Sequence, residues 1–200
     1  MTMEEDKVEE TSASKPATKK KQGQPSASED SASPYPDMDL CQDIHQLTVK
    51  AVTTGKDLSE LQTAAFDKVA KELENPTLYR HMQKTLHVSG GLSEAELLEM
   101  DAKHAKTLEE LEAKVEEAKE SAGDMEVMDA RVEIARFAAK SLSKETALDA
   151  YQKLLDLPKI SSGKKIDALM ESSRVASFYS DTDKSDEFIE SVRDFLFIDL

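Results

Sequence analysis

Two stretches of this chain repeat one another: residues 134–155 read IARFAAKSLSKETALDAYQKLL, and residues 175–196 read VASFYSDTDKSDEFIESVRDFL. A shift of 41 positions aligns them without a gap. The apolar pairs that result are Ile134 with Val175, Ala135 with Ala176, Phe137 with Phe178, Leu148 with Ile189, Tyr151 with Val192, Leu154 with Phe195, and Leu155 with Leu196. Within each stretch the apolar residues recur three and four positions apart, which is typical of amphipathic helices. We therefore expect each copy to be a pair of helices.

A polar turn separates the two expected helices of each copy, at residues 141–144 and again at 180–184. Ser143 and Asp183 are the N-cap candidates, since short polar side chains accept hydrogen bonds from the first turn of a helix. A period near 40 with two helices indicates an α-solenoid of tetratricopeptide or HEAT-like kind. Residues 124–200 are thus predicted to be two stacked helix pairs.

Stacking leaves the last helix of such an array with one uncovered face. In this chain that face includes Val192, Phe195 and Leu196, which we expect to be partly exposed, so that the ordered part should be only marginally stable alone. It must meet either a further repeat or another protein.

Residues 92–123 predict a long charged helix. Ser93 and Glu96 have the spacing of a capping box, so the helix is expected to run from Glu94 to Ala122, with Gly123 as its terminator. Its apolar seam consists of Leu97, Met100, His104, Leu108, Leu111, Val115 and Ala118. The seam either packs on other helices of this chain or docks against a helix of a partner.

Residues 37–91 predict three shorter helices. The first carries its apolar face on Leu40, Ile44, Leu47 and Ala51, and should end near Thr54-Gly55. Asp57 and Glu60 can cap the second, whose stripe is Leu61, Ala65, Val69 and Leu73 and which Asn75-Pro76 should end. Pro76 suits the first turn of the third, which is apolar at Leu78, Tyr79, Met82 and Leu86 and should close at Gly90-Gly91.

Residues 1–36 contain almost no large apolar side chain, so we expect a disordered tail there. Within it, Lys19-Lys20-Lys21 is either a solvated run or a nuclear localisation signal. The alternation that predicts a strand is absent from the sequence. The expected fold class is therefore all-α: a solenoid of tetratricopeptide-like pairs, a long charged helix and a tail.

Composition excludes several functions. Charged residues make up 34% of the chain and the net charge is −15, which opposes unaided binding to nucleic acid or to an anionic membrane surface. The longest apolar run, residues 195–198, is too short to span a bilayer. The acidic N-terminus does not resemble a signal peptide, and the single Cys41 cannot form an internal disulfide. We therefore expect a cytoplasmic and nuclear protein in a reducing compartment.

No chemically active site is expected. His45, His81, His87 and His104 lack metal-ligand spacing, and each is expected at the surface or only partly packed. A helix N-terminus could lower the pKa of Cys41, but His45 has no third group to orient it as a base. Residues 161–165 resemble a phosphate-binding loop but lack its first Gly and its final Ser or Thr, so an inter-repeat loop is expected. We predict no catalytic, cofactor-binding or metal-binding residues and no enzyme activity.

The order of several segments resembles a known family. These are NPTLY at residues 75–79, the charged helix at 97–119, ARVEIA at 130–135, KETALDAY at 144–151 and RVASFYSD at 174–181. Together, over residues 37–196, they resemble the N-terminal half of the non-ATPase regulatory subunit six family of the 26S proteasome lid. The resemblance implies a right-handed superhelix of helix pairs, without catalytic residues or cofactors. It also implies a scaffold role in a hetero-oligomeric complex with other lid subunits, in support of ubiquitin-dependent degradation.

Members of that family end in a PCI domain, and no residues remain after Leu200 to form one. We therefore expect either a fragment or a shortened product.

Two alternative functions stay open. One is a scaffold similar to subunit one of the COP9 signalosome, which shares this repeat family. The other is a free-standing helical-repeat adaptor that binds peptides, although the acidic surface disfavours the acidic tails that such grooves usually take.

Overall fold

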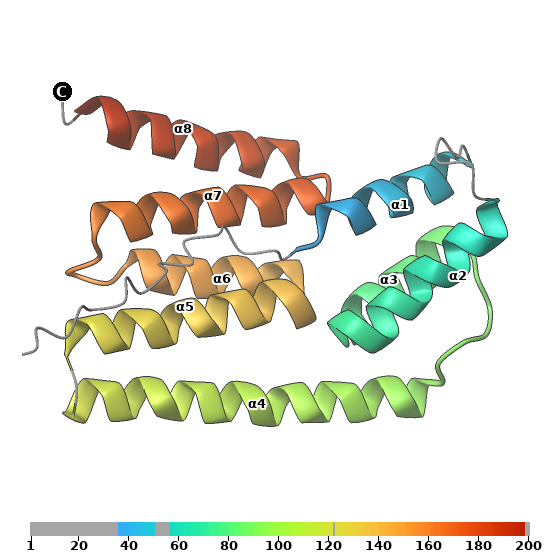
Figure 1. Cartoon of the computed structure of the whole chain (residues 1–200), viewed down its shortest axis with the longest axis horizontal. Helices are drawn as coiled ribbons and strands as arrows, with labels where there is room; N and C mark the ends of the chain where they lie inside the picture. Colours follow the sequence, from blue (N-terminus) through green and yellow to red (C-terminus); the bar gives the residue numbers. More distant parts are fainter. Residues whose placement is uncertain (1–35, 51–56, 122, 199–200) are drawn as a thin grey trace, which may run out of the picture. The chain divides into compact units, whose positions relative to one another are not determined.

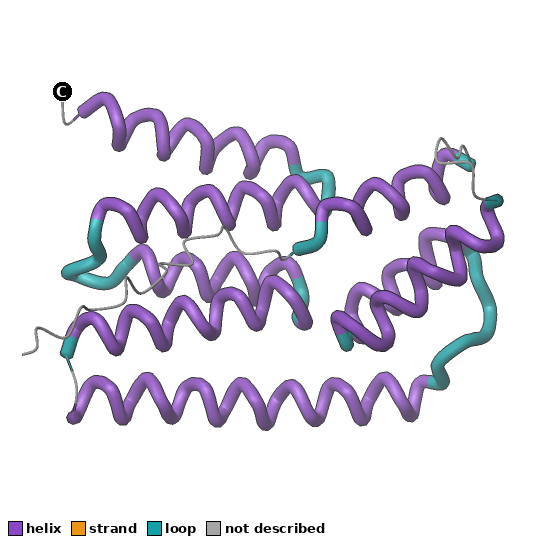
Figure 2. Tube along the Cα trace, viewed as in Figure 1, coloured by secondary structure: helices purple, strands orange, loops and turns teal. Residues whose placement is uncertain are grey.

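The computed structural model describes residues 36–50, 57–121 and 123–198, and all of their regular structure is helical. Figures 1 and 2 show the arrangement of these helices. Their bounds are α1 (Met38–Val49), α2 (Leu58–Lys68), the π-helical turn η1 (Val69–Leu73), α3 (Pro76–Leu86), α4 (Glu94–Ser121), α5 (Asp124–Ser141), α6 (Lys144–Leu155), α7 (Ser162–Phe178) and α8 (Thr182–Ile198). The all-α prediction is confirmed. The predicted tail and Lys19–Lys21 lie outside the described residues.

The last four helices pack in chain order, α5 on α6, α6 on α7 and α7 on α8 (Figure 1). Successive helices are antiparallel because the turns between them are short. The predicted helix pairs are therefore α5 with α6 and α7 with α8, and stacked pairs are what the repeat of 41 residues indicates.

The turns of the two pairs confirm one predicted cap and correct another. Ser143 caps α6, with its hydroxyl accepting the amide N–H of Thr146 at 3.2 Å. Asp183 is not a cap: α8 begins at Thr182, and Asp181 accepts the amide N–H of Lys184 at 3.3 Å. Ser180 adopts a left-handed backbone with a φ of 57°, which turns the chain early enough for Asp181 to take the cap position.

The segment expected to be an inter-repeat loop is instead the start of α7. Ser161 is the N-cap and its hydroxyl accepts the amide N–H of Lys164 at 3.4 Å, so residues 162–165 form the first helical turn. The loop prediction was wrong because Ser161 caps a helix, a position in which Ser is strongly favoured.

The capping box of α4 is confirmed: Glu96 accepts the Ser93 amide N–H at 2.7 Å, and Ser93 accepts that of Glu96 at 3.4 Å. Gly123 does not terminate this helix in a left-handed conformation. It is extended, with φ −101° and ψ 175°, and it is the N-cap of α5, where Glu126 accepts its N–H at 3.0 Å. Because α5 begins directly after α4, Gly123 caps the start of α5 and not the end of α4.

The first and third of the N-terminal helices end earlier than predicted. Left-handed backbone at Lys50 (φ 54°) ends α1 at Val49, and the expected end at Thr54-Gly55, with Ala51, lies outside the described residues. Left-handed His87 (φ 52°) ends α3 at Leu86, before Gly90-Gly91. Gly91 lies instead in the linker to α4, where a Cβ would overlap the hydroxyl of Tyr79.

The caps and stripe of the second helix are confirmed. Asp57 accepts the Glu60 amide N–H at 2.7 Å, and Leu61, Ala65, Val69 and Leu73 are all buried. The stripe continues through η1, a π-helical turn that was not predicted. Asn75 then caps α3 by accepting the amide N–H of Leu78 at 2.8 Å, with Pro76 in the first turn as expected.

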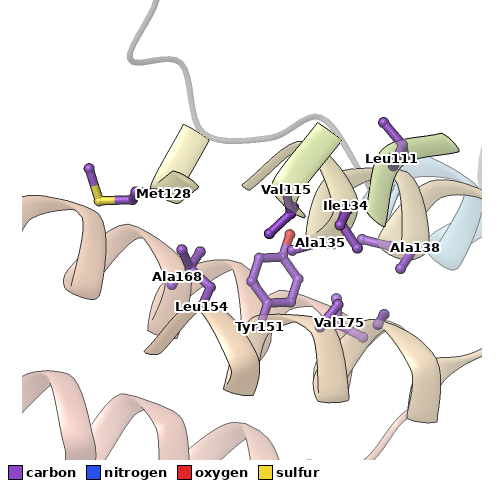
Figure 3. Packing of buried hydrophobic residues seen from close by; sticks show 13 residues of the cluster. Leu111, Val115, Met128, Ile134, Ala135, Ala138, Tyr151, Leu154, Ala168 and Val175 are labelled. Atoms are coloured by element: carbon purple, nitrogen blue, oxygen red, sulfur yellow. The ribbon is translucent and has the colours of Figure 1, made fainter. Parts of the chain in front are cut away.

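The described helices bury two apolar clusters. The repeat core lies among α4, α5, α6 and α7, and Figure 3 shows the Tyr151 ring of α6 directed toward Val115 and Ala135 in it. The N-terminal core lies among α1, α2, η1 and α3, and takes in Leu97 of α4 and Phe178 of α7. Helix α4 contributes to both clusters.

Candidate interaction surface

Cys41, which was considered as a nucleophile, lies against the end of α7. Cys41 is half-buried and its thiol donates to the Phe178 carbonyl at 3.5 Å. Burial raises its pKa, so the lowering considered from the helix N-terminus does not occur. In the described part of the chain, no three His, Cys, Asp or Glu side chains lie where they could hold a metal ion. None of the helices described there has the length and apolar character that crossing a membrane needs.

One histidine differs from the prediction. His104 is only 3% exposed, and its ring packs edge-on to Phe137 with centroids 5.6 Å apart. The signal was present in the sequence, because His104 stands at helical spacing within the apolar seam of α4. A seam position predicts burial more strongly than residue type does.

The seam of α4 packs within the chain. Leu97, His104, Leu111 and Val115 are buried against the chain's own helices, which confirms the first of the two interpretations of this helix. The rest of the α4 surface carries acidic side chains and the exposed Leu98.

Helix α8 presents an exposed apolar surface, although its residues differ in part from those predicted. Ile189 is 48% exposed, Leu196 51% and Phe197 68%. Phe195 is partly covered, with the Lys165 ammonium 4.9 Å from its ring centroid, whereas Val192 is buried. The expected exposure is thus confirmed for Phe195 and Leu196 and wrong for Val192, which faces α7.

The matching residues of α6 show why this face is open. Leu148 and Leu155, the counterparts of Ile189 and Leu196, are partly buried against the repeat core, to which the next helix, α7, contributes Ala168 and Val175. In the described residues no helix takes the place of α7 beyond α8. The exposed face of α8, defined by Ile189, Leu196 and Phe197, is therefore the candidate interaction surface.

A buried polar network joins the two helix pairs beneath this surface. Glu171 of α7 is 3% exposed; it accepts from Arg136 of α5 at 2.9 Å and from the hydroxyl of Tyr151 of α6 at 2.8 Å. Burial, followed by the charge of Glu171 and their hydrogen bond, raises the pKa of Tyr151. The network connects α5, α6 and α7 and fixes the register of the stack. Sequence reasoning missed it, although Ala168, Glu171 and Val175 share one helical stripe.

These features define a helical-repeat protein. Helices α4 to α7 share the repeat core, and α8 has an exposed apolar face. Residues 93–198 match the family model described as 26S proteasome subunit RPN7, and the match covers α4 through α8 and just over half of the chain. The chain belongs to this family. Comparison with curated proteins gave no match.

Proposed function

We propose that this chain is a scaffold subunit of the 26S proteasome regulatory lid, equivalent to non-ATPase regulatory subunit six. In this role it holds other lid subunits in a hetero-oligomeric complex and so supports ubiquitin-dependent degradation in the cytoplasm and nucleus. The family match over α4 to α8 carries the proposal, because the matched segment includes both described helix pairs and the exposed face of α8.

The physical basis of the scaffold role is the exposed face of α8. An amphipathic helix of a neighbouring subunit would pack on Ile189, Leu196 and Phe197 as α7 packs on α6 within this chain. Fully burying a Leu or Phe side chain stabilises by roughly 1.5–3 kcal/mol. Three such side chains therefore supply a useful anchor within a larger interface.

Affinity purification of the tagged chain from cells, followed by mass spectrometry, tests the assignment. We expect lid subunits to copurify. Recovery of signalosome subunits would support the alternative scaffold similar to subunit one of that complex. Recovery of neither complex would favour a free-standing adaptor and contradict the proposal.

A pair of variants tests the surface. Leu196→Glu with Phe197→Glu places charge on the exposed face of α8, and recovery of lid subunits should fall at least tenfold. The matched control is Leu98→Glu on α4. Leu98 is similarly exposed, at 57%, but lies outside the candidate interaction surface on α8. Equal recovery of lid subunits with both variants would show that α8 is not part of the interface. It would not contradict the assignment to the lid.

A further inference from the structure

His104 lies where α4 passes from one core to the other. Toward the N-terminus of the helix, Leu97 belongs to the N-terminal core, and toward the C-terminus, Leu111 and Val115 belong to the repeat core. His104 stands between them on the same seam and is 3% exposed. It is thus a titratable residue at the junction of two apolar clusters.

The imidazole has no acceptor for a second proton. Its Nδ1 atom is buried without a hydrogen-bond partner, and the ring lies edge-on to Phe137 of α5. A neutral imidazole has one N–H donor and leaves the other nitrogen as an acceptor, whereas the imidazolium needs two acceptors. Protonation at this place would bury an unpaired donor, which carries a penalty.

Charges of both signs surround His104. Glu74, from the end of η1, and Asp101, on α4, favour the protonated form, while Lys103 on α4 and Lys140 on α5 oppose it. Glu74 is already engaged, because it accepts from the Lys103 ammonium at 2.7 Å. Burial is the largest influence, and it lowers the pKa of His104 below its ordinary value of 6.5.

The two cores are joined beside this histidine by polar contacts. The Asn75 amide nitrogen donates to the carbonyls of Lys140 and Leu142, each at 3.1 Å. The Ser141 hydroxyl donates to the Leu73 carbonyl at 2.8 Å. These bonds hold the start of α3 on the end of α5, and Glu74 lies between the two bonded residues. Opening at this point replaces these hydrogen bonds with water and exposes His104.

We propose that His104 is a proton-sensitive latch, whose protonation releases α1 to α3 from the end of α5. In the closed junction the start of α3 is hydrogen-bonded to the end of α5, and in the open junction these bonds are broken. The neutral imidazole favours the closed junction, whereas the imidazolium favours the open one, in which both of its N–H groups reach water. The closed state therefore has its full stability above pH 6.5 and loses it as the pH falls from 6.5 toward the lowered pKa of the closed form. Across that window the ratio of open to closed junction rises by up to about tenfold per pH unit.

Hydrogen exchange of the full chain at pH 7.5 and 5.5, corrected for intrinsic rates, measures the opening. We expect peptides over residues 69–82 and 137–142 to open several-fold more at pH 5.5, while α6 keeps its protection. His104→Phe keeps an aromatic ring and should abolish the pH dependence. His81→Phe, at an exposed histidine of α3, is the matched control and should retain it.

Opening that is the same at both pH values in the wild type, or that keeps its pH dependence in His104→Phe, would overturn the proposal. An equal loss of protection in α6 would also overturn it, because it indicates global destabilisation. A direct titration of the His104 ring by NMR in the wild-type chain tests the same claim without a variant. A pKa at or above 6.5 would contradict the latch.

Discussion

The two helix pairs have the same sequence period but hold together differently. The first pair, α5 with α6, buries Tyr151 completely, with Leu154 and Ala147 beside it. The interface of the second pair, α7 with α8, includes the buried Val192 and a cluster of hydroxyls, in which the Ser185 hydroxyl lies 2.9 and 2.8 Å from those of Ser173 and Ser177. The apolar residues that repeat the first pair's core lie partly on the outer face of α8.

The comparison teaches that a repeated pattern sets where helices form, while neighbours on both sides decide what becomes core. Helix α6 packs on both α5 and α7, whereas α8 packs mainly on α7 among the described helices. A serine contact provides weaker and more local stabilisation than an apolar core, since the net contribution of a hydrogen bond is about 1 kcal/mol. We therefore expect α8 to be the least stable part of the stack until a partner covers it.

The largest expected effect is at Tyr151. Tyr151→Ala removes a fully buried ring and the hydrogen bond to Glu171, so the free energy of unfolding should fall by about 3–5 kcal/mol. Urea unfolding followed by circular dichroism measures it. Tyr151→Phe keeps the ring and should cost about 1–2 kcal/mol. A loss below about 1 kcal/mol for the alanine variant would mean that the ring is not the centre of the repeat core.

The next effect concerns the register of the two pairs. Glu171→Gln weakens the buried pairing with Arg136 and Tyr151 and should cost about 1–3 kcal/mol, less than a fully buried ion pair because Arg136 is 39% exposed. Glu133→Gln is the control, since its ion pair with Lys114 is more than half exposed and should cost under about 0.5 kcal/mol. Equal losses in the same unfolding assay would refute the special role of Glu171.

A smaller effect is expected within the second pair. Ser185→Ala removes the hydroxyl that Ser173 and Ser177 share, and should destabilise the protein by about 1 kcal/mol. Hydrogen exchange should show the change mainly in α8. Ser191→Ala, which removes an exposed hydroxyl bonded only to the Glu187 carbonyl, should be close to neutral. If Ser185→Ala also lowered the hydrogen-exchange protection of α6, the effect of the Ser185 hydroxyl would not be confined to the second pair, which would contradict the prediction.

The smallest effect on stability is expected at Leu196. Leu196→Glu changes a side chain that is 51% exposed and should alter the unfolding free energy by less than about 0.5 kcal/mol. A thermal melt of the isolated chain measures it. A large destabilisation would place Leu196 in the core of the isolated protein, and the distinction between covered α6 and open α8 would fail.

Local patterns in the sequence predicted much of the fold. The seam of α4, the stripe through Leu61 and Leu73, and the caps at Asp57, Ser93 and Ser143 depend on residues close in the chain, and the structure confirms them. The open face of α8 followed from the repeat, because a stacked array exposes its last helix.

Features that depend on residues far apart could not be predicted in the same way. Asp181 and Asp183 are equally good caps, and the left-handed backbone of Ser180 decides between them. The pairing of Glu171 with Arg136 spans 35 positions, so a carboxylate on α7 gave no sign of its partner beyond its place on a buried stripe. His104 was expected at the surface or only partly packed; its place in the seam was the overlooked sign of burial, and the missing partner of Nδ1 depends on the packing of α5.

Native-state hydrogen exchange on the isolated chain tests the central claim most directly. It compares the free energies of opening for amides in α6 (Lys144–Leu155) and in α8 (Thr182–Ile198). We predict that α8 opens with a clearly lower free energy than α6, close to local fraying at its C-terminal turns. Protection of α8 equal to that of α6 would contradict an open terminal helix awaiting a partner.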